Sequence, residues 1–191
     1  FPKQLKGAVE DNLSRLHLEQ LHLVHFRYNE HSGAPFVDSL AAMAELQQEG
    51  KIRHIGLSSV TLEQIRIAQK MFQVASVQNL YNLVDRRDED ILDYCTQQGI
   101  PFMPYFPLAM GRLGGEVRPL VTLAQRHHAT PAQVALAWLR SRSPQMVLIP
   151  GTRSVAHLEE NIASANIKLS EEERKELAES QELSSIQSFR Y

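Results

Sequence analysis

The stretch QMVLIPGTRSVAHLEEN, residues 145–161, decides how this chain is interpreted. Its apolar part, 146–149, has the pattern of a short buried strand and ends in a Pro-Gly pair. A Thr-Arg-Ser turn follows, in which Ser154 is a typical N-cap for a helix near 155–164. A strand that feeds a helix N-terminus often holds phosphate, because backbone N–H groups and the helix dipole favour an anion there. The same pattern also fits an ordinary strand-turn-helix with Arg153 in solvent, and this stretch alone leaves both interpretations open.

The composition excludes several classes of protein. The chain has 191 residues, 43% of them hydrophobic and 22% charged, with a formal net charge of -2. These values are typical of one soluble globular domain, and they give no electrostatic basis for binding nucleic acid. No apolar run approaches the roughly 20 residues that cross a bilayer, so we expect no membrane partner. The single cysteine, Cys95, excludes an internal disulfide and favours a reducing, cytoplasmic location. Its apolar helical surroundings predict a buried structural thiol.

Strand-like apolar runs alternate with helical patterns along the chain. Alternation at this spacing predicts βαβ units and a parallel sheet. Helix-capping residues support the predicted helices: Gly50 and Gly99 lie where C-terminal glycines belong, and Thr130 and Ser170 are typical N-caps. The expected strands are 20–25, 52–57, 74–79, 101–105 and 146–149, and the expected helices are 3–15, 36–49, 61–71, 87–98, 117–128, 131–142, 155–164 and 170–181.

These units belong to one domain, 1–191, in which 182–191 is expected to be a loose tail. A closed eight-stranded barrel usually takes roughly 250 residues, so five βα units are too few to make one. An open doubly wound sheet is the other arrangement of such units, but no GxGxxG follows any predicted strand. An isolated set of five units would leave unpaired strand edges. We therefore expect either more chain upstream of Phe1 or a partner that closes the sheet.

Several motifs occur in a fixed order along the chain. They are LHLVHFR (21–27), HIGLSSV (54–60), SVQNLYN (76–82), PYFPLAMGRL (104–113), ATPAQVALAWLRSRS (129–143) and LIPGTRSVAHLEEN (148–161). Together they resemble the aldo-keto reductase family of NADP-dependent enzymes, which are α/β proteins with a (β/α)8 TIM barrel. The resemblance extends from about Phe1 to about Ser180. It implies that the chain supplies strands four to eight, about five βα units plus a leading and a trailing helix, and that strands one to three are missing.

The resemblance implies that His25, at the end of the first predicted strand, is an active-site residue. In a barrel, ligands bind at the carboxyl ends of the strands. A neutral imidazole there can donate an N–H to a carbonyl oxygen on which negative charge develops. Without the resemblance, a lone His is more often a core or rim residue bonded to backbone.

The resemblance also implies a general acid that this chain lacks. In the family a Tyr donates the proton, and a Lys and an Asp tune its pKa; all three come from the first three strands. A phenol needs such tuning because its usual pKa is near 10. None of the tyrosines here has the matching sequence context: Tyr28, Tyr81, Tyr94, Tyr105 and Tyr191. We therefore expect the complete enzyme to reduce a small carbonyl substrate, an aldehyde or ketone, and this portion alone to be inactive.

For the cofactor, NADP(H), the resemblance assigns a nicotinamide end. Ser58, Ser59 and Gln78 would hold the carboxamide, since hydroxyls and a side-chain amide suit an amide group. Many members of the family carry Asn where this chain has Ser59. Tyr105 would stack on the nicotinamide ring, although a half-buried aromatic at a strand end is common in any barrel.

The resemblance places the phosphates and the adenine further along the chain. The loop Phe106-Pro107-Leu108-Ala109-Met110-Gly111 would wrap the pyrophosphate through backbone N–H groups. An Arg fork suits the terminal phosphate of NADP, although many members carry a Lys where this chain has Gly151. The residues expected at the adenosine phosphate and the adenine are Gly151, Thr152, Arg153, His157, Glu160 and Asn161.

Other candidate sites fail on spacing. His127 and His128 are adjacent and point to different sides of a helix, so we expect no metal site there. The charged runs 85–90 and 171–176 are interpreted as solvated helix starts. Two alternatives to a reductase stay open. One is a non-catalytic, partial-barrel protein or subunit that binds a dinucleotide, and the other is a different barrel enzyme with the same phosphate site.

Overall fold

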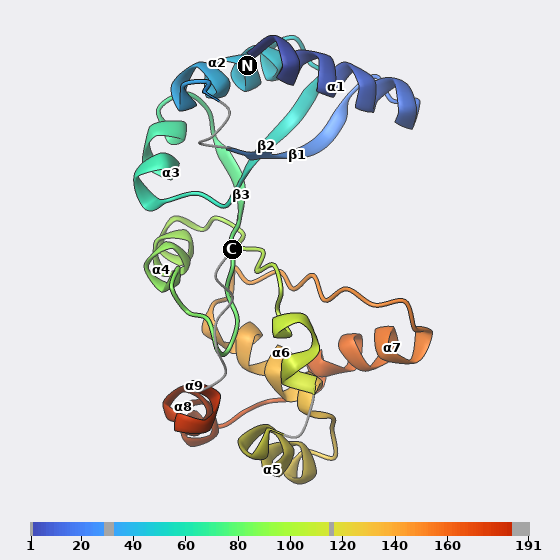
Figure 1. Cartoon of the computed structure of the whole chain (residues 1–191), viewed down its shortest axis with the longest axis vertical. Coiled ribbons are helices and arrows are strands. Elements are labelled where there is room, and N and C mark those ends of the chain that lie inside the picture. Colours follow the sequence, from blue (N-terminus) through green and yellow to red (C-terminus); the bar gives the residue numbers. More distant parts are fainter. Residues whose placement is uncertain (1, 29–32, 115–116, 185–191) are drawn as a thin grey trace.

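The computed structural model describes residues 2–28, 33–114 and 117–184. They form a C-shaped arc, with helices α1 to α4 on its outer side and the strands nearer its inside (Figure 1). The elements in chain order are α1 (Pro2–Leu16), β1 (Leu21–Arg27), α2 (Phe36–Gln48), β2 (Ile52–Ser58), α3 (Leu62–Gln69), β3 (Val74–Gln78), α4 (Glu89–Gln98), the 3₁₀ helix η2 (Ala109–Gly114), α5 (Arg118–Arg126), α6 (Pro131–Arg142), α7 (Val155–Ala163), the 3₁₀ turn η3 (Ser164–Asn166), α8 (Glu171–Glu179) and α9 (Gln181–Ser184).

The sheet is parallel, as the alternation of strands and helices predicts. Its strand order is β1-β2-β3, with both pairs parallel. In this register His25 lies opposite Gly56, and Ser58 lies opposite Gln78. Strand β1 continues to Arg27, so His25 lies two residues before the strand end rather than at it. The register brings residues from three strands together on one face of the sheet.

The expected strands 101–105 and 146–149 are the main difference from prediction. They pair only through isolated parallel bridges, from Phe102 to Val77 and to Met146, and from Tyr105 to Leu80. The direction of the sheet is kept, because Phe102 N donates to Gln145 O and Val147 N donates to Phe102 O, each at 2.9 Å. Prolines explain the interruption: Pro101, Pro104 and Pro150 have no N–H to donate to a ladder.

The predicted helix ends are confirmed by their hydrogen bonds. Thr130 and Ser170 each accept from the third helical backbone N–H, and the side chain at that position returns a bond, which is a capping box. Gly99 has φ +67° at the C-cap of α4, a conformation that only glycine adopts at no steric cost. These local signals fix where α4, α6 and α8 begin or end.

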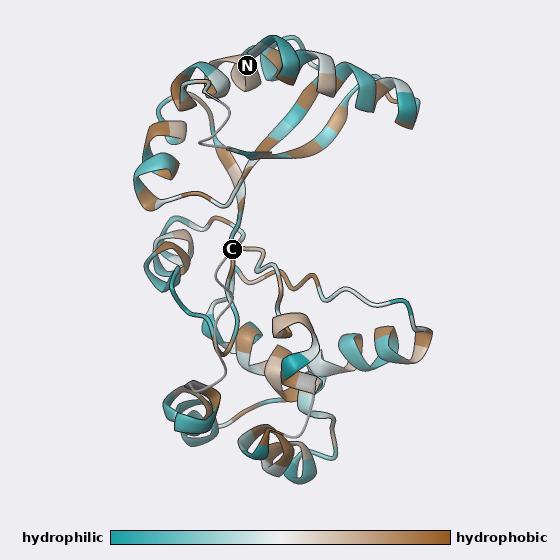
Figure 2. Cartoon of the chain, in the orientation of Figure 1, coloured by the Kyte–Doolittle hydropathy of each residue, from teal (hydrophilic) through white to brown (hydrophobic). Residues whose placement is uncertain are grey.

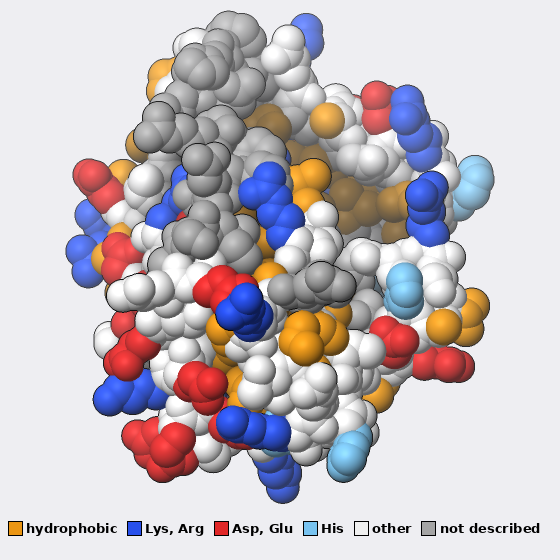
Figure 3. All heavy atoms as spheres, turned by 60° about the horizontal axis from the view of Figure 1, so that its bottom comes forward, with side chains coloured by type: hydrophobic (Ala, Val, Ile, Leu, Met, Phe, Trp, Pro, Cys, Tyr) orange, Lys and Arg blue, Asp and Glu red, His pale blue; other side chains and the backbone are white. Residues whose placement is uncertain are grey.

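The core lies between the strands and the outer helices. Ile55 and Leu57 of β2 are fully buried against this layer, and so is Leu40 of α2. Some apolar side chains are not covered by this core: Leu23 of β1 and Val147 remain 43% and 44% exposed. Hydrophobic and hydrophilic segments alternate along β1 and β2 in Figure 2. Figure 3 shows a recess with hydrophobic side chains on its floor. The arc therefore presents apolar surface on its concave side.

Three further expectations can be compared with the structure. Cys95 is buried, as predicted, and burial raises the pKa of its thiol to about 12. The charged run 85–90 is not simply a solvated helix start, because the Asp85 side chain is buried and accepts two bonds from Arg87. Residues 182–184 of the expected loose tail belong to helix α9, and Leu183 is buried. The rest of that tail, 185–191, lies outside the described residues.

Candidate functional site

His25 lies on the inner face of the sheet in a small polar contact. Its Nε2 is 2.9 Å from Oγ of Ser76, two strands away. Gly56 lies between them, and a Cβ at that position would come within 2.6–2.8 Å of the His25 ring and of Ser76 Oγ. Real Cβ atoms essentially never approach so closely, so the pair requires glycine at position 56.

Burial sets the charge of His25. Desolvation lowers the pKa of the imidazole below its usual value of 6.5, because a half-buried ring loses hydration when it is charged. His25 is therefore neutral at neutral pH and carries one N–H and one acceptor nitrogen. A neutral imidazole of this kind can donate a hydrogen bond to a carbonyl oxygen.

The residues predicted for the nicotinamide end are connected by hydrogen bonds. Ser59 N donates to Gln78 O at 2.9 Å, and the Ser59 hydroxyl is 3.3 Å from the Tyr105 hydroxyl. Ser58 is buried beside them in the register opposite Gln78. Ser59 has φ +55°, in the left-handed region that Asn and Gly adopt more readily than Ser. These residues at the ends of β2 and β3, together with Tyr105, therefore form one polar surface, here called the Ser59–Tyr105 wall.

The loop after Tyr105 has an unusual backbone. Phe106, Ala109 and Met110 have positive φ values of 55°, 48° and 57°, and Gly111 has φ +90°. Two internal bonds fold it: Ala109 N donates to Phe106 O, and Gly111 N donates to Leu108 O, each at 2.9 Å. Non-glycine residues with positive φ are strained and cluster at ligand sites. The backbone of this loop is therefore a candidate ligand contact.

The turn before α7 has the geometry that the opening motif predicts. Ser154 caps the helix, with its Oγ accepting from His157 N at 3.4 Å. Thr152 Oγ1 accepts from Ser154 N at 3.1 Å. The side chains of Arg153 and His157 are exposed. The turn therefore places a positive helix end and two basic side chains next to one another.

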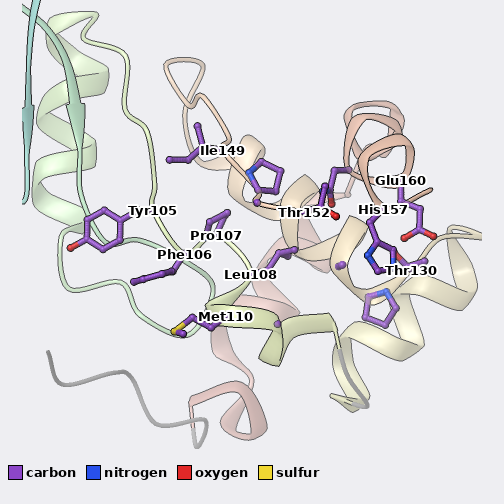
Figure 4. A pocket seen from close by; sticks show the side chains of 16 residues that line it. Tyr105, Phe106, Pro107, Leu108, Met110, Thr130, Ile149, Thr152, His157 and Glu160 are labelled. Carbon is purple, nitrogen blue, oxygen red and sulfur yellow. The ribbon is translucent and has the colours of Figure 1, made fainter. Parts of the chain in front are cut away.

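A pocket of about 1050 Å³ joins these last two features and is the candidate ligand site. Tyr105 and Phe106 lie at one end of it, and His157, Glu160 and Thr130 lie at the other (Figure 4). Of the predicted cofactor residues, those that line it are Tyr105, Phe106, Pro107, Leu108, Gly111, Gly151, Thr152, His157, Glu160 and Asn161. Ser58, Ser59, Gln78 and Arg153 do not line it, and neither does His25.

Sequence reasoning did not assign several residues of the site. Thr130, Pro131 and Ala132 at the start of α6 line the pocket, as do Ile149 and Pro150. Met110, which belongs to the predicted pyrophosphate loop, also lines it. The signal for Thr130 was present, since its N-cap pattern places its side chain at a helix start. Gly56 and Ser76 also carry no role in the sequence analysis. Both lie inside quoted motifs, but their contact with His25 depends on strand register.

Tyr81 is not suited to act as a general acid. Tyr81 is fully buried against Trp138 and Phe102, and burial raises the pKa of its phenol to about 12.

Within residues 2–28, 33–114 and 117–184, no group of three or more His, Cys, Asp or Glu side chains could hold a metal ion. No helix in the same ranges combines the length and apolarity that crossing a membrane requires.

Comparison with known proteins identifies the family. The model of the Aldo/keto reductase family matches residues 2–182. The chain belongs to the aldo-keto reductase family. Pyridoxine 4-dehydrogenase of Escherichia coli is 44% identical over 90% of this chain, and an uncharacterised oxidoreductase of Schizosaccharomyces pombe is 42% identical over 90%. An aldo-keto reductase of Klebsiella pneumoniae, solved with NADP and acetate, is 31% identical and superposes with a TM-score of 0.79 over 91% of this chain.

These relatives also define the architecture. The aldo-keto reductase structures that match are (β/α)8 barrels, so the parallel arc is part of such a barrel. This chain spans 61% of the Escherichia coli protein, 56% of the Schizosaccharomyces pombe protein and 63% of the Klebsiella pneumoniae chain. The family has members that were solved with NADP or NADPH bound.

Proposed function

We propose that the complete protein is an NADP-dependent oxidoreductase that transfers a hydride from NADPH to an aldehyde or ketone. One observation carries this proposal. Residues of the predicted pyrophosphate loop, Tyr105 and residues of the N-terminal turn of α7 line a single pocket of about 1050 Å³. Membership of the aldo-keto reductase family and its NADP-bound members add support.

The pocket residues fit a phosphorylated dinucleotide. The strained loop from Phe106 to Gly111 would hold the pyrophosphate through its backbone, and Tyr105 would pack against the nicotinamide. At the other end, the helix N-terminus with Thr152 and His157 would hold the adenosine phosphate. Arg153, exposed beside the pocket, would add charge-assisted bonds. The cofactor supplies the hydride, and the protein supplies position and electrostatics.

His25 would act on the substrate. A neutral imidazole on the concave side of the arc is suited to donate a hydrogen bond to a carbonyl oxygen as negative charge builds on it. Ser76 would keep the ring in place, and Gly56 makes room for both. This role requires the ring to approach the nicotinamide end of the bound cofactor.

We further propose that additional barrel strands, or a partner that closes the sheet, pack on the two ends of the arc. Leu23 of β1 and Val147 in the segment before Pro150 expose apolar surface, and Val155 and Ile162 are 73% and 66% exposed on α7. Apolar stripes of this kind usually face another element. The general-acid Tyr would come from the same additional elements, since none of the tyrosines here has the sequence context of the family's general acid.

The relative in Escherichia coli suggests a first substrate to test. It is named pyridoxine 4-dehydrogenase and is 44% identical over 90% of this chain. Pyridoxine is therefore the first alcohol to test as a substrate in the oxidative direction, with the corresponding aldehyde in the reductive direction. We also propose a cytoplasmic location, which the one buried, unpaired cysteine favours.

The proposal is tested with the complete protein in two steps. Calorimetric titration with NADPH and then NADH measures the cofactor, and carbonyl-dependent oxidation of NADPH measures turnover. Binding with turnover of at least one aldehyde or ketone is the expected result. Tight binding with no turnover on any carbonyl would favour the alternative, a non-catalytic dinucleotide-binding protein. No binding of either dinucleotide would end the proposal.

A further inference from the structure

The segment NLYNLVD, residues 79–85, follows β3 directly and has no role in the proposed function so far. It lies between the two loops that carry predicted nucleotide contacts, the one after β2 and the one after Tyr105. Asn79 and Asn82 are each only 2% exposed. Buried amides are costly unless every polar atom has a partner, so their partners show what the segment holds.

Asn79 ties the loop after β2 to its surroundings. Its Nδ2 donates to Val60 O at 2.8 Å and to Asp88 Oδ2 at 2.9 Å, and its Oδ1 accepts from Val60 N at 3.1 Å. Its backbone oxygen accepts from Tyr105 N at 3.0 Å. One residue therefore fixes the backbone next to Ser59 and also the start of the Tyr105 loop.

Asn82 holds the next part of that loop. Its Nδ2 donates to Phe106 O at 3.1 Å. Its Oδ1 accepts from Val84 N at 3.0 Å and from Asp85 N at 2.9 Å, which closes a tight turn. The Nδ2 donor therefore serves the Phe106 loop, and the Oδ1 acceptor serves the turn of its own segment.

Phe106 needs such support because of its backbone. A left-handed φ of +55° is unfavourable for a bulky aromatic residue, and such residues persist only where the surroundings fix them. The Phe106 carbonyl accepts from Asn82 Nδ2 and, within the loop, from Ala109 N. The Asn82 bond connects the strained peptide to the rigid part of the barrel.

We propose that Asn82 is a positioning residue for the nucleotide pocket, which holds the Phe106 peptide in its ligand-binding conformation, and that Asn79 does the same for the Ser59–Tyr105 wall. This inference rests on the proposed function, since it assumes that the loop from Phe106 to Gly111 contacts the dinucleotide. Asn82 itself does not line the pocket. It acts through the Phe106 carbonyl.

Asn82→Asp in the complete protein separates the donor role of the side chain from its acceptor role. The variant keeps an oxygen for the N–H groups of Val84 and Asp85, and it removes the donor to Phe106 O. Calorimetry then measures two ligands: NADPH, which reaches the loop, and adenosine 2′-phosphate, which has the adenine end of NADPH without the pyrophosphate. We expect the Kd for NADPH to rise about tenfold, since a lost buried hydrogen bond is of this size, and the Kd for adenosine 2′-phosphate to stay within about twofold.

Ser143→Ala is the matched control. It also removes a buried side-chain hydrogen bond, to Thr96, but Ser143 does not line the pocket. We expect it to bind both ligands like the wild type. If Asn82→Asp does not fold, Asn82→Ser, which is shorter and uncharged, is measured in the same way. Unchanged NADPH affinity in a folded Asn82 variant, or equal losses for both ligands, would overturn the inference. A wild type that binds no NADPH would instead overturn the proposed function.

Discussion

Oγ of Ser76 lies 2.9 Å from Nε2 of His25, and the space for this contact exists because residue 56 is glycine. The three residues come from three neighbouring parallel strands, β1, β2 and β3. A hydrogen bond across the middle strand requires that the middle strand carry no side chain at that point. The orientation of the proposed active-site histidine is therefore a property of the sheet register.

Gly56→Ala should displace the His25 ring, although the substitution adds only one methyl group. The new Cβ would lie 2.6 Å from His25 Cδ2 and 2.7 Å from Ser76 Oγ, so the ring must move. Overpacking of this kind costs about 1–3 kcal/mol of unfolding free energy. Urea unfolding of the complete protein measures this loss. Steady-state kinetics should show a lower kcat. The Kd for NADPH should change little.

Gly7→Ala is the control for that experiment. Gly7 lies within α1, and a Cβ there meets nothing within 4 Å. Because alanine favours a helix over glycine, the variant should gain about 0.5–1 kcal/mol and keep wild-type turnover. If the two glycine variants behaved alike, the steric role of Gly56 would be wrong.

The pH dependence of stability should contain a contribution from His25. Burial lowers its pKa in the folded protein below the usual 6.5, so near and below that pH the unfolded state binds more protons. The free energy of unfolding must then rise with pH from the folded pKa up to about 6.5 and level off above it. His25→Gln should flatten this rise in urea unfolding at stepped pH. His22→Gln, an exposed histidine of the same strand, should leave it in place, and an unflattened rise in His25→Gln would contradict the assignment.

Local chemistry explains why much of this fold could be predicted from sequence. Thr130 and Ser170 begin helices because their hydroxyls accept from the third helical N–H, a contact that depends on only four consecutive residues. Gly99 ends a helix by the same local logic. The order of strands and helices also follows from neighbouring residues, since apolar periodicity needs no knowledge of distant contacts.

The rest depends on contacts between distant residues. The pair of His25 and Ser76 is 51 positions apart in the chain, and only register brings it together. Asp85 looks like a surface acid in sequence, but its carboxylate is buried and pairs with the half-exposed Arg87. Phe106 gives no local sign of a left-handed backbone, because tertiary contacts such as that from Asn82 impose it. The pattern of side chains predicted many of the residues that line the pocket, but not the residues that shape it.

Arg153→Ala should weaken NADPH binding more than NADH binding. The side chain is exposed, so water competes for its bonds, and the expected difference is about 1 kcal/mol, or about fivefold in Kd. Calorimetric titration of the complete protein with each cofactor measures it. Arg53→Ala removes another exposed arginine away from the pocket and should change neither affinity. Equal losses for both cofactors would remove Arg153 from the terminal phosphate.

Gly151→Lys should strengthen NADPH binding. Gly151 lines the pocket and is exposed, and a Cβ at this position would meet nothing within 4 Å, so a long side chain fits. An added exposed cation near a phosphate contributes about 0.2–1 kcal/mol, which is up to about fivefold in Kd, and salt should screen the gain. Gly151→Ala makes the same backbone change without charge and should match the wild type. A gain that persists at high salt would argue against a charge effect.

Ile162→Asp tests whether other parts of the barrel cover α7. Val155, Leu158 and Ile162 are spaced i, i+3 and i+7, so they form one stripe, and all three are exposed in this arc. If additional strands or a partner cover the stripe in the complete protein, an aspartate there is buried without a partner, and the free energy of unfolding should fall by about 1–3 kcal/mol. Ala156→Asp places the same residue on the same helix away from the stripe, and its effect should stay within about 0.5 kcal/mol. Equal, small effects in both variants would mean that the stripe faces solvent in the complete protein and that closure of the barrel leaves α7 uncovered.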